Sequence, residues 1–174
     1  MSVSDIGRPP TGGIRCAVLT VSDTRTPDTD TSGRAIQNLF GNAGLDVTDY
    51  QIVRDVPSLV TPIVRDWTET GDVRIIVTTG GTGIAARDST YEAVTLLFGK
   101  ELRGFGELFR MLSYQEIGAA AMLSRATAGV VSRSAIFVLP GSEQAVRLAM
   151  TRLILPEIEH VVRELEKDRP TSEA

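Results

Sequence analysis

Short apolar runs alternate with amphipathic stretches along the chain, and the runs predict the strands of a buried sheet. The four main strands are expected over residues 14–22, 46–53, 75–77 and 135–139. Ile75, Ile76 and Val77 are consecutive β-branched residues, the pattern of a strand buried on both faces of a parallel sheet. A weaker alternation of short β-forming and polar residues over 126–134 predicts a small hairpin before the last strand.

The stretches between these runs carry apolar residues three or four positions apart, which predicts amphipathic helices. Helices or helical pieces are expected over residues 33–42, 58–70, 90–98, 102–113, 114–123 and 143–167. We expect Gly44 to end the first helix and Pro156 to kink the last, because proline lacks the N–H that a helix interior needs. Strands that alternate with helices predict an α/β fold with right-handed crossovers.

The composition is that of one globular domain. The chain has 174 residues, of which 42% are hydrophobic and 23% charged. A chain of this length buries roughly 70% of its unfolded surface, so it needs no disulfide and no structural metal to fold. We expect a flexible tail over residues 1–13, a single domain over 14–168 and a frayed end over 169–174.

Charge and cysteine content exclude several classes of function. A net charge of −4 argues against a protein that binds nucleic acid, which would show a basic stripe. Cys16 is the single cysteine, which excludes an internal disulfide and a cysteine-cluster zinc site, and we expect it to be a small buried core residue. The apolar runs are only a few residues long, so we expect no signal peptide, no membrane span and a cytoplasmic protein.

Polar clusters follow several of the predicted strands. Ser22 and Asp23 end the first strand, Asp55 comes just after the second, residues 79–88 follow the third, and residues 140–142 follow the last. The carboxyl ends of parallel strands meet at one edge of a sheet, where ligands bind in α/β folds. We therefore expect these four loops to lie together and to form a site.

The glycine loop, Gly80–Gly83, is the most informative of these clusters. Its three glycines let the chain turn sharply and leave no Cβ between the N–H groups and a ligand. Strand, glycine loop and the start of a helix near residue 90 form a place where backbone donors can meet a phosphate. Asp88 would oppose that phosphate unless a cation lay between them, which indicates Mg²⁺ and a nucleotide.

Two standard phosphate-binding motifs fit less well. A Walker-type loop needs Lys followed by Ser or Thr, whereas residues 99–100, Gly-Lys, precede Glu101. Residues 81–86 match the dinucleotide fingerprint G-x-G-x-x-A, but the capping signals come too late for a helix to open at its third position.

A serine or cysteine nucleophile needs a general base such as histidine nearby. The single histidine, His160, falls in the last predicted helix, far from Cys16 and from every serine-bearing loop, which argues against nucleophilic catalysis. The remaining chemistry is phosphoryl or nucleotidyl transfer, with Asp55 and Asp88 available to hold Mg²⁺. A nucleophile that is already anionic would need no base from the protein.

The chain resembles the MogA/MoaB family of molybdenum cofactor biosynthesis from residue 14 to about 166. The resemblance rests on the order and spacing of V-L-T-V-S-D-T, T-T-G-G-T-G with R-D-S-T behind it, A-M-L-S-R-A, and L-P-G-S. It implies a molybdopterin-binding domain with a three-layer α/β/α fold and a mostly parallel sheet, assembled as a homotrimer or, in some members, a hexamer. It also implies Mg²⁺-dependent transfer of AMP from ATP to molybdopterin, after which the product passes to molybdate insertion.

The resemblance further implies roles for particular residues. Asp55 and Asp88 would be the catalytic carboxylates and would hold Mg²⁺. The residues expected around the phosphates, the pterin and the nucleotide are Ser22, Asp23, Thr79, Gly80, Gly81, Thr82, Gly83, Ser124, Pro140, Gly141 and Ser142.

The chain departs from the best-characterised adenylyltransferases of this family at a few positions. Residues 85–86 are both Ala and Tyr91 follows the Ser-Thr pair, where those enzymes have prolines, and Val56 stands where a second acidic residue is common. These features resemble the MoaB branch, some of whose members bind pterin without turnover. Two hypotheses therefore stand, an adenylyltransferase, favoured by the presence of Asp55 and Asp88, and a non-catalytic accessory protein. A molybdate-insertion domain is a remoter third, since it usually sits in a longer chain.

Overall fold

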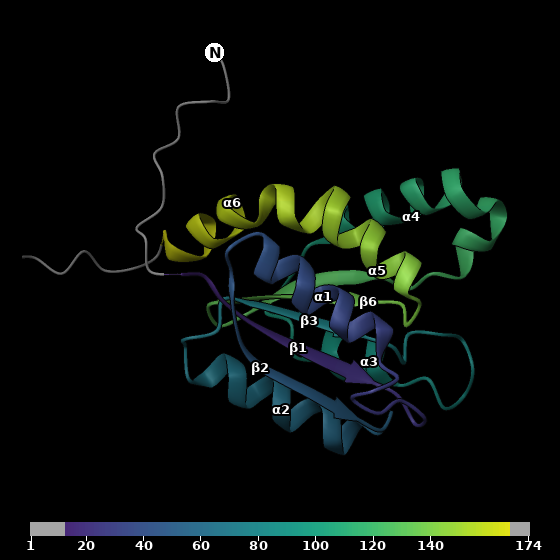
Figure 1. The fold of residues 1–174 in the computed structure, drawn as a ribbon, viewed down its shortest axis with the longest axis horizontal. Coiled ribbons are helices and arrows are strands. Elements are labelled where there is room, and N and C mark those ends of the chain that lie inside the picture. Colours follow the sequence, from purple (N-terminus) through teal and green to yellow (C-terminus); the bar gives the residue numbers. More distant parts are fainter. Residues whose placement is uncertain (1–12, 168–174) are drawn as a thin grey trace, which may run out of the picture.

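The protein is described by a computed structural model over residues 13–167. Six strands in this range form one sheet in the order β2-β1-β3-β6-β5-β4. Figure 1 labels β1, β2, β3 and β6 of this sheet. The strands are β1 (Arg15–Val21), β2 (Asp46–Val53), β3 (Ile75–Thr79), β4 (Lys100–Glu101), β5 (Thr127–Val131) and β6 (Ser134–Leu139). The tail expected over residues 1–13 lies outside the described range apart from Gly13, and the end expected over 169–174 lies wholly outside it.

The sheet is mostly parallel, as the sequence predicts. Strands β2, β1, β3 and β6 are parallel, β5 is antiparallel to β6, and β4 is antiparallel to β5. The predicted hairpin is formed by β5 and β6, so its second strand is the last strand of the sheet and not a separate piece. The sequence pattern does not predict β4, because two residues are too few to show a strand periodicity.

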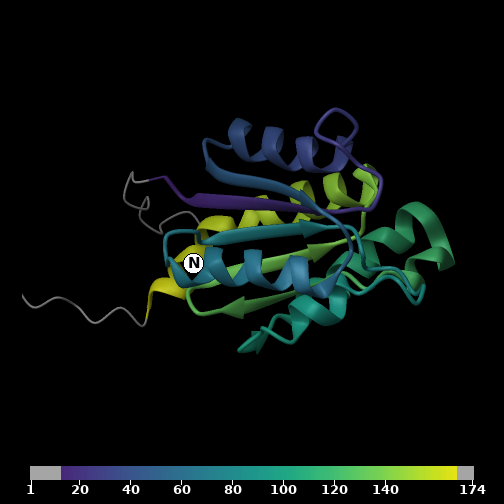
Figure 2. The same ribbon diagram turned by 90° about the horizontal axis from the view of Figure 1, so that it is seen from below.

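Parallel pairing brings the carboxyl ends of four strands to one edge of the sheet. Strands β1, β3 and β6 run to the same side in Figure 2, where the loops that follow them gather. Thr79, the last residue of β3, is level with Thr20 of β1 and with Leu139 of β6. The three loops therefore start at the same height.

Helices join the strands and follow β6. They are α1 (Thr31–Asn42), α2 (Pro57–Glu69), α3 (Thr90–Thr95), α4 (Arg103–Ile117), the 3₁₀ turn η1 (Gly118–Leu123), α5 (Glu143–Ala149), the π-helical turn η2 (Met150–Ile154) and α6 (Leu155–Glu166). No helix in residues 13–167 is both long enough and apolar enough to cross a membrane.

Two helix boundaries differ from the sequence prediction for local reasons. The helix expected over 102–113 continues to Ile117, and only then does a helical piece of another type follow. Gly118, with φ of 63°, ends α4 in the left-handed conformation that favours glycine. The helix expected over 90–98 ends at Thr95, because Gly99 donates its N–H to Val130 and joins the sheet.

The disturbance expected at Pro156 takes the form of a π-helical turn just before it. In η2 the backbone N–H of Leu155 reaches the carbonyl of Met150, one residue further back than in an α-helix. The wider turn lies where the proline ring would otherwise meet the preceding helical turn. The helical segment over 143–166 is thus unbroken but irregular.

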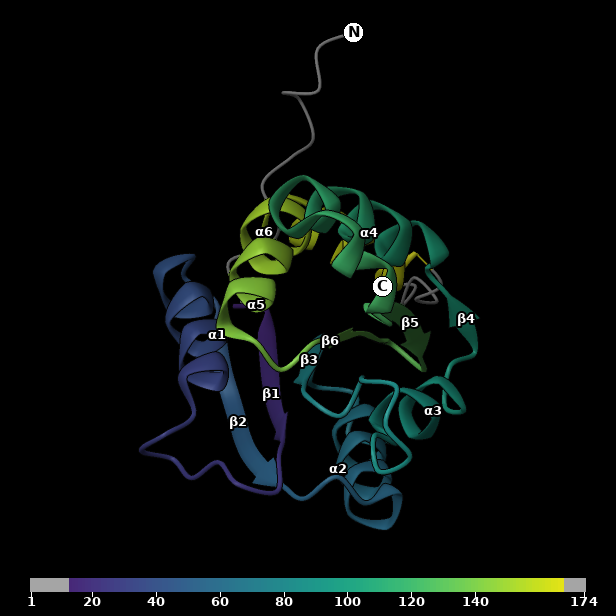
Figure 3. The same cartoon turned by 90° about the vertical axis from the view of Figure 1, so that its right-hand side faces the viewer.

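The helices cover both faces of the sheet and give the predicted three-layer fold (Figure 3). Helices α1, α4, α5 and α6 bury one face, whose core includes Cys16, and burial raises the pKa of the Cys16 thiol to about 12. Helices α2 and α3 bury the other face, where Trp67 is 4% exposed and donates Nε1–H to Asp49 at 2.8 Å. Cys16 is a buried core residue, as expected, and Trp67 belongs to the core of the other face.

Helix α1 begins at Thr31 and not at residue 33, because a buried carboxylate caps it. Asp30 is 1% exposed, and its Oδ1 accepts the N–H of Gly33 at 2.9 Å. Its Oδ2 accepts the hydroxyls of Thr20 and Tyr50, both at 2.6 Å. Burial, together with the hydrogen bond to Asp30, raises the pKa of Tyr50 above its usual value. This network ties α1 to β1 and β2.

Two glycines of α1 provide a test of this network. A Cβ on Gly33 would collide with Asp30 Oδ2 and come within 2.6 Å of Thr20 Oγ1, whereas one on Gly41 would meet nothing within 4 Å. We expect Gly33→Ala to lower the free energy of unfolding by about 1–3 kcal/mol through overpacking. Gly41→Ala should raise it by about 0.5–1 kcal/mol through helix propensity. Urea unfolding measures both, and equal effects would show that the network leaves room at Gly33.

Candidate active site

The loops at the carboxyl edge line two adjoining cavities. The larger has a volume of about 500 Å³ and the smaller about 170 Å³. The predicted site residues that line the larger one are Gly80, Gly81, Thr82, Gly83, Asp88, Ser124, Pro140, Gly141 and Ser142. Those that line the smaller one are Ser22, Asp23, Asp55, Gly81 and Asp88. The two cavities meet at Gly81 and Asp88, which line both.

Thr79 is the one predicted site residue that lines neither cavity. It is 1% exposed, and its Oγ1 donates to the carbonyl of Pro140 at 2.8 Å. On the other side of that loop, Ser32 donates its hydroxyl to the carbonyl of Gly141 at 2.8 Å. Thr79 therefore contributes by fixing the loop after β6 beside the glycine loop.

The larger cavity also has an apolar wall that the sequence analysis does not predict. Phe109 and Ile117 of α4 and Leu123 of η1 contribute to it. They belong to a helical segment inserted between β4 and β5, which crosses above the carboxyl edge. A sequence pattern identifies such a helix, but its position over the edge follows only from the packing of the whole domain.

The backbone of the glycine loop is bonded at its ends and open between them. Gly80 donates its N–H to Leu139 at 3.0 Å, and the carbonyl of Gly81 accepts the N–H of Thr90 at 3.1 Å. Within residues 13–167, no acceptor lies within hydrogen-bond reach of the N–H groups of Gly81, Thr82, Gly83 and Ile84. Four successive donors are thus without an acceptor in the described protein, and three of these residues, Gly81, Thr82 and Gly83, line the cavity.

Gly81 is required by the protein's own packing as well. Its φ is +66°, and a Cβ there would collide with Thr90 Oγ1 and come within 2.5 Å of Asp55 Oδ2. In the sequence pattern, the reason for this glycine is the expected approach of a ligand. The structure adds an internal reason, so its substitution affects the loop before any ligand binds.

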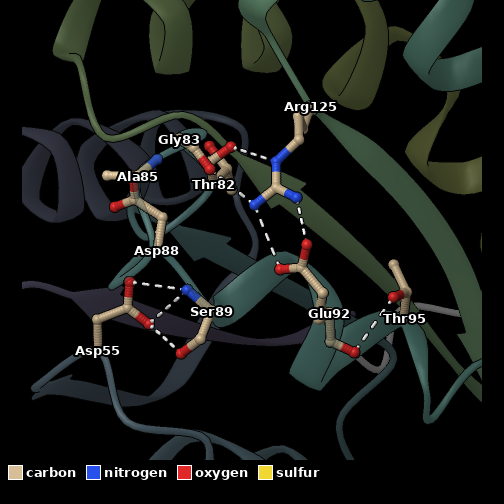
Figure 4. Close-up of polar contacts among 9 residues, drawn as sticks. All are labelled: Asp55, Thr82, Gly83, Ala85, Asp88, Ser89, Glu92, Thr95 and Arg125. Atoms are coloured by element: carbon tan, nitrogen blue, oxygen red, sulfur yellow. Dashed lines mark hydrogen bonds and ion pairs between the residues drawn. The ribbon is translucent and has the colours of Figure 1, made fainter.

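Asp55 fixes the start of α3. Its Oδ1 accepts the hydroxyl of Ser89 at 2.9 Å, and both its oxygens accept the N–H of Ser89 at 3.3 Å (Figure 4). Oδ1 also accepts the hydroxyl of Thr90 at 3.0 Å. Ser89, at the N-cap position, caps no N–H with its own side chain, so Asp55 supplies the acceptor from another loop. The backbone N–H of Asp55 in turn donates to Asp23 Oδ1 at 3.3 Å.

Asp88 is less constrained. Its Oδ2 accepts the N–H of Ala85 at 3.0 Å, while its own N–H donates to the carbonyl of Ala85 at 2.9 Å. No donor among residues 13–167 reaches Oδ1 of this carboxylate. Asp88 therefore retains an open oxygen where the two cavities meet.

The donor set fits Mg²⁺ shared with a ligand and not a metal held by protein alone. No group of three or more His, Cys, Asp or Glu in the described range could hold a metal ion. Asp88 offers Oδ1, and Asp55 offers Oδ2, whose one hydrogen bond is long at 3.3 Å. Magnesium in enzymes is often bound by one or two carboxylates together with substrate phosphates and water.

Comparison with known proteins agrees with this architecture. Residues 17–160 match the family described as a probable molybdopterin binding domain. Molybdenum cofactor biosynthesis protein B of Halalkalibacterium halodurans is 55% identical over 157 residues, which cover 90% of this chain and 92% of that protein.

Solved structures of similar proteins have the same fold. A crystal structure of a molybdenum cofactor biosynthesis protein B has 50% identity and a TM-score of 0.86, covering 88% of this chain and 96% of that one. The structure of tungsten cofactor synthesizing protein MoaB from Pyrococcus furiosus has 35% identity and a TM-score of 0.80, covering 91% of this chain and 100% of that one.

The contact of Gly81 with Asp55 and Thr90 can be isolated by a matched pair of variants. Gly81 and Gly44 have φ of +66° and +74°, but a Cβ on Gly44 would meet nothing within 4 Å. Alanine in this conformation costs roughly 1–2 kcal/mol, so Gly44→Ala measures that cost. We expect Gly81→Ala to lose a further 1–3 kcal/mol, approximately, from the collision. Equal losses in chemical denaturation would show that Asp55 and Thr90 leave space at residue 81.

Proposed function

The chain belongs to the molybdopterin-binding domain family of molybdenum cofactor biosynthesis protein B, and on this premise we propose that it is a Mg²⁺-dependent molybdopterin adenylyltransferase. An oxygen of the terminal phosphate of molybdopterin would attack the α-phosphorus of ATP. A new P–O bond forms, the bond between the α- and β-phosphates breaks, and pyrophosphate leaves. The product is adenylyl-molybdopterin, which the molybdate-insertion protein would accept.

The observation that carries this proposal is the pairing of open backbone donors with an open carboxylate oxygen. The N–H groups of residues 81–84 have no acceptor within residues 13–167, and Gly81, Thr82 and Gly83 line the same cavity as Asp88, whose Oδ1 is open. Donors alone would suit a bare anion, and a carboxylate alone would suit a cation. Together they suit a phosphate that carries a metal ion.

The two cavities suit two ligands. The larger, at about 500 Å³, is in the range of small-molecule sites and has an apolar wall against which a flat pterin could pack. The smaller cavity is polar and is lined by Asp23, Asp55 and Arg87, which suits the phosphates of a nucleotide when Mg²⁺ lies between them and the carboxylates. Phosphates from both ligands would meet at Gly81 and Asp88, where the cavities adjoin.

The side chains around the cavities favour positioning over acid–base catalysis. The residues that line the two cavities in the described range include no His, Cys or Lys. A phosphate nucleophile is already anionic and needs no base, so this inventory fits adenylyl transfer. Mg²⁺, when bound, would supply charge neutralisation. Asp55 and Asp88 would hold it, and the glycine loop would orient the phosphates.

The proposal includes a cellular setting and an assembly. We place the protein in the cytoplasm, where ATP is available, with small-molecule substrates and without nucleic acid or membrane as a partner. We also propose a homotrimer, two of which could pair into a hexamer. On α4, Phe109 is buried, but Leu108, Met111 and Tyr114 are 47%, 53% and 64% exposed, more apolar surface than one helix usually leaves to solvent.

The two carboxylates should respond differently to the same substitution. Asp88→Asn removes the charge that would hold Mg²⁺, while the one hydrogen bond that the carboxylate accepts within residues 13–167 can still be accepted by the amide oxygen. We expect pyrophosphate release to fall roughly 10²–10⁴-fold, at about 1.4 kcal/mol for each tenfold, with pterin affinity and stability nearly unchanged. Asp55→Asn should slow turnover as well and also lower the free energy of unfolding by about 1–3 kcal/mol, because the donors of Ser89 and Thr90 lose a charged acceptor.

Pyrophosphate release from ATP and molybdopterin, pterin binding and urea unfolding together decide this prediction. Asp66→Asn is the control, because Asp66 is an exposed carboxylate on α2 away from both cavities. Wild-type protein that binds pterin without releasing pyrophosphate would establish the accessory-protein alternative. An active protein whose Asp88→Asn variant is equally fast would show that the metal is held elsewhere.

The assembly can be tested by light scattering at micromolar concentration. We expect a mass of three chains or a multiple of three, and Met111→Glu should lower it, because a charge in an apolar interface is costly. Leu59→Glu is the control, since Leu59 is 38% exposed on α2 instead of α4. A wild type with the mass of a single chain would contradict the proposed trimer.

A further inference from the structure

Arg125, which follows η1, lies between the glycine loop and α3 (Figure 4). Its Nε donates to the carbonyl of Thr82 at 2.9 Å, and its Nη2 donates to the carbonyl of Gly83 at 2.7 Å. Both Nη atoms bind the Glu92 carboxylate, and the guanidinium lies 4.8 Å from the ring centre of Tyr91. The side chain is only 26% exposed.

These bonds determine where the open donors of the loop point. In a trans peptide the C=O of one residue and the N–H of the next point in opposite directions, and residues 13–167 contain no cis peptide bond. Since Arg125 holds the carbonyls of Thr82 and Gly83, the N–H groups of Gly83 and Ile84 point away from the guanidinium. Those two groups belong to the four that have no acceptor within the described protein.

Arg125 is not placed to bind a ligand in the site itself. It lines neither of the two site cavities but a separate one of about 400 Å³. All three nitrogens of its guanidinium already donate to Thr82, Gly83 or Glu92. Its influence on a phosphate would therefore act through the loop.

Glu92, the carboxylate partner of Arg125, connects Arg125 to Asp55 through α3. Glu92 is in α3, whose first residues, Ser89 and Thr90, hold Asp55. The hydrogen bond from Arg125 lowers the pKa of Glu92, so the ion pair is intact at neutral pH and is lost only in acid, as the carboxylate becomes protonated. The loop is thus held from one side by Arg125 and from the other by Asp55.

We propose that Arg125 is a positioning residue that holds the glycine loop in its phosphate-binding conformation by binding two of its carbonyl groups. The identity of the phosphate ligand rests on the proposed function, but the restraint on the loop does not. Lysine could not replace this residue, because a single ammonium group lacks the planar fork that holds two carbonyls and a carboxylate together.

The first test measures the loop without any ligand, by hydrogen–deuterium exchange. In Arg125→Lys and Arg125→Ala, the bonded amides of Ala85, Ser89 and Thr90 should exchange about tenfold faster or more, since bonds from a charged donor that fix the loop are gone. Exchange in β1 and β3 should not change. Arg103→Lys is the control, because Arg103 lines the same separate cavity but binds Glu101 and no loop carbonyl.

The second test measures phosphate binding by calorimetry, with Mg-ATP and with inorganic pyrophosphate as probes. We expect Arg125→Lys to weaken both by about tenfold or more even though it keeps the charge. Glu92→Gln keeps the carbonyl bonds, so its loss should stay below about threefold. A lysine variant that binds like the wild type would show that only the charge matters and would overturn the proposal.

The two tests separate this inference from the proposed function. Unchanged exchange in both Arg125 variants overturns the positioning role, whatever the protein binds. Faster exchange in a protein whose wild type binds neither Mg-ATP nor pyrophosphate supports the positioning role and contradicts the adenylyltransferase. If Arg125→Ala does not fold, Arg125→Lys alone decides.

Discussion

Parallel pairing of β2, β1, β3 and β6 is the constraint on which the site depends. Each of these strands is followed by a loop at the same edge of the sheet, and the strand register places the starts of those loops side by side. Bonds one step beyond the strand ends extend this order, since Ser22 donates its N–H to Val53 and Gly80 donates to Leu139. The hydrogen bonds between the strands therefore extend into the first residues of the loops. Polar residues far apart in sequence are brought together by the sheet itself.

This constraint explains why the sequence alone predicts most of the residues that gather at the carboxyl edge of the sheet. Apolar runs mark the strands, and Ser22, Asp55 and the glycine loop follow them directly, so parallel pairing alone brings them together. Contacts that join distant segments leave no periodic signal. Asp30 caps α1 through a network with β1 and β2, and Arg125 reaches a loop some forty residues earlier in the chain. Such partners are fixed by tertiary packing, which a local pattern does not contain.

The glycines of the loop meet two separate structural requirements. A ligand would need bare backbone donors, and the protein needs space for Asp55 and Thr90 beside Gly81. A glycine at this position satisfies both, so its presence alone does not separate binding from packing. Packing explains the missing Cβ of Gly81, but it does not involve the N–H groups of residues 81–84, which have no acceptor within residues 13–167. The proposed function assigns these groups to a phosphate.

A loop with open donors is intrinsically weakly held, since the hydrogen bonds that would fix it are left for a ligand. Its conformation must then come from groups outside it. Asp55 binds the residues after the loop through Ser89 and Thr90, and Arg125 binds the carbonyls within it. Neither contact uses the open N–H groups of the loop, which the proposed function assigns to a phosphate. Asp55 Oδ1 is accordingly occupied by two hydroxyls, whereas Asp55 Oδ2 accepts only one long hydrogen bond and Asp88 Oδ1 accepts none from residues 13–167. The two carboxylates thus have different environments: Asp55 also holds the start of α3, whereas Asp88 is the freer of the two to bind the metal ion that the proposed function requires.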